Sequence, residues 1–79
     1  MPYIKREAQW ELLNRAPETA GELNFLFTIQ AKEYIKVKGE SYQTYNDIIG
    51  ALEGCKMELY RRLVAAYEDK KIVENGDVY

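Results

Sequence analysis

The residues best suited by type to bind a ligand form a basic and aromatic group in the C-terminal half of the chain. Lys56, Arg61 and Arg62 are flanked by Tyr60 and Tyr67. Guanidinium groups hold phosphate oxygens through paired hydrogen bonds, and the flat tyrosine rings can stack on a base. These five residues are therefore the candidate ligand-binding site for a small anionic, nucleotide-like molecule.

The same residues also have a simpler interpretation as surface ion pairs. Glu58 precedes Arg61 and Arg62 by three and four positions, the spacing at which side chains of one helix meet. Such exposed pairs contribute only a few tenths of a kcal/mol. Arginines that face a concave interface without carboxylate partners would support the ligand site, whereas arginines that pair with Glu58 in water would favour a protein partner.

The residue types needed for common catalytic and metal sites are missing from the sequence. With no histidine in the chain, Ser-His-Asp and Cys-His arrangements are excluded. Cys55 is the single cysteine; it lies in an apolar stripe, where a thiol is usually an inert part of the core. We therefore expect a protein that binds and does not catalyse, with no metal and no cofactor.

Small residues and tyrosines point to an interface. Gly50 and Gly54 lie four positions apart, and each costs about 1 kcal/mol relative to alanine inside a helix. Because glycine carries this cost, its presence suggests that another helix, or alternatively a flat ligand, approaches the backbone closely at these positions. The seven tyrosines suit a partly wet interface, or equally the edge of a core. The predicted interface residues are Tyr45, Ile49, Gly50, Gly54, Met57 and Val64.

Two helices are predicted in the first half of the chain. The first covers about residues 4–15 and is ended by Pro17. The second covers about residues 20–38, begins at a capping box formed by Thr19 and Glu22, and ends at Gly39. A strand is the alternative for residues 25–29, because they are aromatic and β-branched, but the helical period continues beyond them.

A third, longer helix is predicted over about residues 44–71, with Ser41 and Thr44 as alternative caps. Its apolar residues form two stripes: Tyr45, Ile48, Leu52, Cys55, Leu59 and Leu63 on one, and Ile49, Met57, Tyr60, Val64 and Tyr67 on the other. A helix of 25 residues is about 37 Å long, more than the other two helices can cover. We expect other copies of the chain to cover the excess.

Residues 72–79 are predicted to form a turn-like or extended tail. Asn75-Gly76 is a typical hairpin signal, but the flanking apolar segments have only two or three residues. We therefore expect a turn followed by an extended end.

Length and charge limit the class of protein. A chain of 79 residues makes a single domain, 1–79, with a small core. Its net charge of −2 argues against binding to long nucleic acids, which requires many basic residues. The sequence has no apolar run near 20 residues and no signal-peptide core, so we expect no membrane partner and a cytoplasmic location.

From Gly21 to Tyr79 the chain resembles a family of small uncharacterised proteins found in bacteria and their phages. The resemblance rests on Gly21-Glu22-Leu23-Asn24, Ser41-Tyr42-Gln43-Thr44, Asn46-Asp47, Ile49-Gly50-Ala51-Leu52-Glu53, Tyr60-Arg61-Arg62, Tyr67-Glu68-Asp69-Lys70-Lys71-Ile72 and Glu74-Asn75-Gly76-Asp77-Val78-Tyr79. The family usually has leucine at the position of Tyr45 and proline at that of Ala66, so the third helix is expected to run further here. The resemblance implies no activity. In size and helical layout alone, the chain is also similar to phage sponges that sequester cyclic nucleotide signals.

Together these observations predict an all-α, three-helix domain, a helical hairpin plus a long C-terminal helix, that forms a homo-oligomer. The expected function is non-enzymatic sequestration of a small anionic nucleotide signal by a phage or prokaryotic protein. The alternative is a protein–protein interaction module, an inhibitor or a scaffold subunit, with no small ligand.

Overall fold

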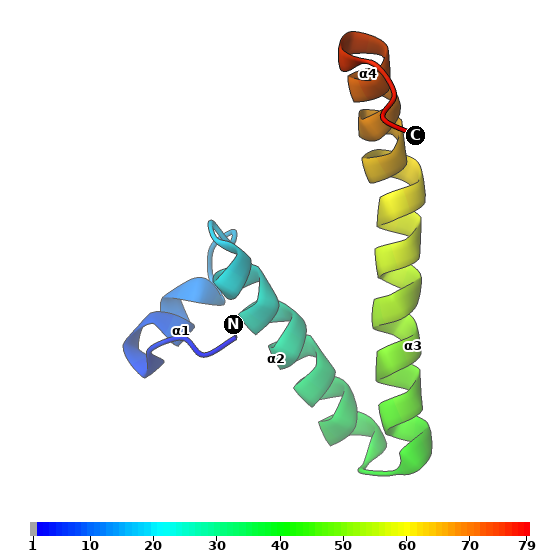
Figure 1. Ribbon diagram of the computed structural model, residues 1–79. Helices are drawn as coiled ribbons and strands as arrows, with labels where there is room; N and C mark the ends of the chain where they lie inside the picture. Colours follow the sequence, from blue (N-terminus) through cyan, green and yellow to red (C-terminus); the bar gives the residue numbers. More distant parts are fainter. Residues whose placement is uncertain (1) are drawn as a thin grey trace. The chain divides into compact units, whose positions relative to one another are not determined.

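The computed structural model describes residues 2–79, and within that range the regular structure is helical throughout (Figure 1). The chain divides into two compact units, one ending at Tyr45 and the other comprising Asn46–Tyr79. The all-helical prediction is confirmed, and the strand alternative for residues 25–29 is wrong because α2 covers them.

Helix α1 covers Arg6–Leu12 and is shorter than the predicted segment 4–15. At its end the Asn14 side-chain amide donates to the Trp10 carbonyl at 2.9 Å. This side-chain donor takes the place of the backbone N–H that would bond to the same carbonyl if the helix continued. Pro17 follows closely and disfavours helical geometry at the residue before it. Side-chain capping by Asn14 therefore ends the helix earlier than the apolar pattern suggested.

Helix α2 covers Ala20–Lys38, as predicted. The Thr19 hydroxyl accepts from the Glu22 backbone N–H at 3.1 Å, which confirms the hydroxyl half of the capping box. The Glu22 carboxylate accepts from the Glu18 backbone N–H at 2.8 Å, one residue before the cap. Gly39 ends the helix with φ of 86°, a conformation that favours glycine, and its N–H donates to the Ile35 carbonyl.

The first unit has a small core. Leu12 at the end of α1 is 1% exposed, and Phe25 on α2 is 5% exposed. Arg15 makes a two-point hydrogen bond to the Glu22 carboxylate, with both N···O distances at 3.1 Å. This pair joins the residues after α1 to the first turn of α2.

Helix α3 covers Tyr42–Leu59, so of the two predicted starts Ser41 is the one used. The Thr44 backbone N–H donates to the Ser41 hydroxyl at 3.1 Å. Thr44 is buried, and its hydroxyl donates to the Gly39 carbonyl at 2.8 Å. Thr44 therefore holds the turn between α2 and α3 and does not begin the helix.

From α3 the helical ribbon continues through η1 (Tyr60–Val64) into α4 (Ala65–Asn75) (Figure 1). Within η1 the Ala65 N–H donates to the Tyr60 carbonyl, a bond between residues five apart that defines a π-turn. The helix passes through Ala66, as expected from the absence of proline there. The π-turn was not predicted from the sequence.

The predicted tail begins too early, because residues 72–75 belong to α4. Gly76 has φ of 89°, and its N–H donates to the Ile72 carbonyl at 2.8 Å. This arrangement repeats the one at Gly39. The Asn75-Gly76 pair is thus a helix end and not a hairpin, and residues 76–79 form the tail.

Candidate interaction surface

The three basic residues of the predicted ligand site lie in ion pairs along their own helix. Arg61 and Arg62 both contact Glu58, with N···O distances of 3.1 and 2.8 Å. Lys56 contacts Glu53 at 3.2 Å. The arginine side chains are 66% and 70% exposed. By the criterion set from the sequence, pairing with Glu58 in water favours a protein partner over a small anionic ligand.

The two tyrosines of the predicted ligand site also have partners on the helix. The Tyr60 hydroxyl donates to the Glu68 carboxylate at 3.0 Å, and this hydrogen bond raises the pKa of Tyr60. The Lys71 ammonium lies 5.4 Å from the centre of the Tyr67 ring, a cation–π distance. Both rings are thus held by their own helix, and ligand binding by these five residues stays a prediction.

The π-turn explains how Tyr60 reaches a residue eight positions further along the chain. In a regular α-helix, residues eight apart differ by about 80° around the axis. One turn with an extra residue removes most of that difference. The Tyr60–Glu68 hydrogen bond therefore spans the π-turn from end to end.

The same turn keeps an apolar stripe on one side of the second unit. Successive apolar residues of the stripe are first separated by alternating spacings of three and four positions. From Leu59 through Leu63 to Tyr67 they are separated by four positions each time. Spacings of four rotate steadily around an α-helix, by about 40° each, and a π-turn cancels that drift. This change of spacing is the signal by which the sequence could have revealed η1.

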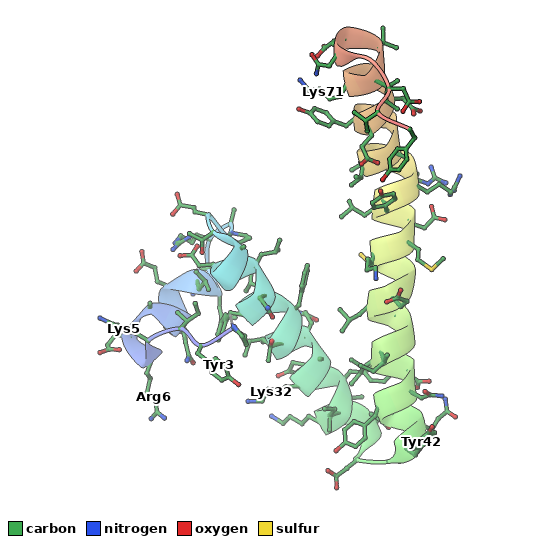
Figure 2. All side chains as sticks on the ribbon, viewed as in Figure 1. Tyr3, Lys5, Arg6, Lys32, Tyr42 and Lys71 are labelled. Atoms are coloured by element: carbon green, nitrogen blue, oxygen red, sulfur yellow. The ribbon has the colours of Figure 1, made fainter. Side chains whose placement is uncertain are left out.

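This stripe and the adjacent exposed members of the second predicted stripe form one surface, which we call the apolar face. Its members are large apolar or aromatic residues between 36% and 66% exposed: Ile49, Leu52, Leu59, Tyr60, Leu63, Val64 and Tyr67. Figure 2 shows side chains standing out from the helix on several sides, with Lys71 near its C-terminal end. The second unit thus exposes side chains of the kind that protein cores usually enclose.

The residues predicted as an interface are open to solvent in the single chain. Tyr45, Ile49, Met57 and Val64 are all exposed. A methyl group added at Gly50 or Gly54 would meet no neighbouring atom within 4 Å. Neither glycine therefore has a close neighbour within the second unit, and their role as interface residues stays a prediction.

The exposure of two further residues, Cys55 and Trp10, was not predicted from the sequence. Cys55 is exposed and not part of a core within this chain, because the stripe that contains it is uncovered. Trp10 on α1 is 76% exposed and was not singled out. Its two-residue spacing from Ala8 and Leu12 places it on the opposite side of α1 from those residues, which is the signal that could have found it.

Residues 2–79 contain no group of three or more His, Cys, Asp or Glu side chains placed to hold a metal ion. In the same range, none of the helices combines the length and the apolar character needed to cross a membrane.

These features define a small all-helical protein with an exposed apolar helix. The chain belongs to a family described as a domain of unknown function (DUF6899), whose model matches residues 1–78. Membership in an uncharacterised family agrees with the resemblance drawn from the sequence. Comparison with curated proteins and with solved structures found no match.

Proposed function

We propose that this protein is a non-enzymatic protein–protein interaction module that assembles through the apolar face of its C-terminal helix. The observation that carries the proposal is the exposure of seven large apolar or aromatic side chains along one side of residues 49–67. Contiguous apolar patches of this kind mark protein contact sites in soluble proteins.

The extent of the apolar face is suited to a stable contact. Half-exposed side chains of this size each leave on the order of 100 Å² in water, so the seven together offer on the order of 700 Å². A standard protein interface takes about 800 Å² from each partner. The face is therefore comparable in area to one side of such an interface.

The charges around the face support a protein partner more than a nucleotide. Arg61 and Arg62 share the Glu58 carboxylate. An anionic ligand would therefore have to compete with that carboxylate for both arginines. The likeness to phage nucleotide sponges remains one of size and layout. Sequestration of a nucleotide signal is accordingly the weaker of the two hypotheses.

The test is sedimentation of the intact chain at micromolar concentration, with two variants. We expect the unmodified protein to sediment well above 9.2 kDa. Leu63→Glu should shift it toward the single-chain mass, because a carboxylate cannot be buried in an apolar contact without a partner. The matched control is Ala66→Glu, at an exposed position outside the apolar face, which should keep the mass of the unmodified protein.

Circular dichroism of both variants checks that the helices remain, since glutamate is a good helix former. If the unmodified chain is a stable, well-folded particle of 9.2 kDa, the proposal fails. Calorimetric titration with a panel of cyclic nucleotides tests the weaker hypothesis, and we expect no heat of binding.

A further inference from the structure

The charges of the second unit are distributed unequally along its helix. Residues 46–59, the part of α3 in this unit, carry three acidic residues and one basic residue, for a net charge of −2: Asp47, Glu53, Glu58 and Lys56. Residues 60–75, η1 and α4, carry four basic and three acidic residues, for a net charge of +1: Arg61, Arg62, Lys70, Lys71, Glu68, Asp69 and Glu74. The two halves therefore differ in sign.

This difference favours one orientation when two copies meet. In a parallel pair, each half would lie against the same half of the partner, and the acidic halves would repel each other. In an antiparallel pair, each acidic half would lie against a basic half. Electrostatic complementarity of this kind selects orientation and partner more than it adds affinity.

The lengths of the two halves also suit an antiparallel pair. They contain 14 and 16 residues, so a partner turned end over end would cover nearly the whole segment. The midpoint of residues 46–75 falls between Tyr60 and Arg61, inside η1. A two-fold axis at that point would give both chains the same contacts, as a symmetric dimer requires.

We propose that the partner on the apolar face is a second copy of this chain, paired antiparallel along residues 46–75 about a two-fold axis near η1. The inference rests on the proposed function and adds that two copies pair on this face, together with their direction. The area of the face is the size that one side of a stable dimer needs, and the opposite charges of its halves set the direction.

The experiment measures distances between spin labels in the assembled protein. Two variants, Ala66→Cys and Val73→Cys, are made in a Cys55→Ser background, so that each chain carries one label. Both positions are exposed and outside the apolar face, and Val73 is 86% exposed. Sedimentation and circular dichroism confirm that each labelled variant keeps the mass and helicity of the unmodified chain.

An antiparallel pair centred in η1 separates the two labels by an amount that grows with distance from the centre. At a rise of 1.5 Å per residue, the separation along the axis is about 17 Å at residue 66 and about 38 Å at residue 73. A parallel pair would give nearly equal separations at both positions, because equivalent residues of two parallel helices lie side by side with no offset along the axis.

The outcomes separate this inference from the function on which it rests. A distance that is clearly longer at residue 73 than at residue 66 supports the antiparallel pair. Nearly equal distances in an assembled protein overturn the inference and leave the interaction module standing. A chain that stays at 9.2 kDa overturns both.

Discussion

Arg15 and Glu22 show how a single pair of side chains can fix a connection between elements. The two-point bond from Arg15 is the largest cause of the lowered pKa of Glu22, and the backbone N–H of Glu18 adds to it. The carboxylate therefore closes both the loop after α1 and the first turn of α2. Because the pair is exposed, its contribution is weakened by solvent and salt.

This pair predicts a pH dependence of stability. The pKa of Glu22 is lowered in the folded protein from an ordinary value near 4.5, so its stabilising effect is present above that value. The effect is lost as the pH falls through the lower, folded-state pKa. Glu22→Gln should therefore lower the urea midpoint at pH 7, and the difference from the unmodified protein should shrink as the pH falls below the ordinary value near 4.5 and through the lower, folded-state pKa.

The matched control for Glu22→Gln is Glu18→Gln, since Glu18 contacts Arg15 through a single oxygen with a 76% exposed side chain. The control should change the midpoint less. A difference between Glu22→Gln and the unmodified protein that is constant from pH 3 to pH 7 would contradict the assignment.

At the scale of elements, the long C-terminal helix combines good local signals with an uncovered surface. Its start at Ser41 and its end at Gly76 are each made by hydrogen bonds within five residues. Its sides, in contrast, are mostly exposed between residues 49 and 79. Helices of this length gain most of their stability from packing of an apolar face, which agrees with the proposed assembly.

Gly50 and Gly54 give a prediction for this helix. Alanine at either position meets open space in the single chain, so each substitution should stabilise the helix by about 1 kcal/mol at concentrations below assembly. Above the assembly concentration, the added methyl groups should weaken association if the contact extends beyond the apolar face to these glycines, as the sequence-based interface prediction requires. Urea unfolding at low concentration and sedimentation at high concentration measure the two effects.

The two effects of Gly50→Ala and Gly54→Ala have opposite signs, which makes their combination informative. Ala51→Ser is the control, at a small exposed neighbour on the same helix, and should change association little. Stabilisation at every concentration would show that the glycines are not contact residues.

At the scale of the whole molecule, stability should depend on protein concentration. The first unit has only a small core, with Leu12 and Phe25 as its buried apolar residues, and the second unit exposes its apolar face. The proposed assembly would add stability by covering this face. When folding and association are coupled, mass action raises the melting temperature with concentration.

We expect the melting temperature to rise by several degrees between about 1 and 100 µM, as followed by circular dichroism at 222 nm. Leu63→Glu should melt at a lower temperature with little dependence on concentration. A melting temperature of the unmodified chain that is constant over this range would argue that each chain folds alone.

The predicted helix limits agree best with the structure where they depend on local hydrogen bonds. The limits of α2, the Thr19 hydroxyl cap and the Gly39 helix end all depend on residues within five positions of each other, so the amino-acid types alone determine them. The errors lie at α1 and the tail, where a side-chain amide and a glycine end the helices at other residues than the apolar pattern indicated.

The sequence by itself determined the helical class, the limits of α2 and the excess of apolar residues in the second half, because these follow from residue type and spacing. Only the tertiary structure decided the π-turn, the pairing of Arg61 and Arg62 with Glu58, and the exposure of Cys55. The physical reason is that several rotamers and helix registers satisfy the same spacing. Which one forms depends on how each side chain meets its neighbours in space.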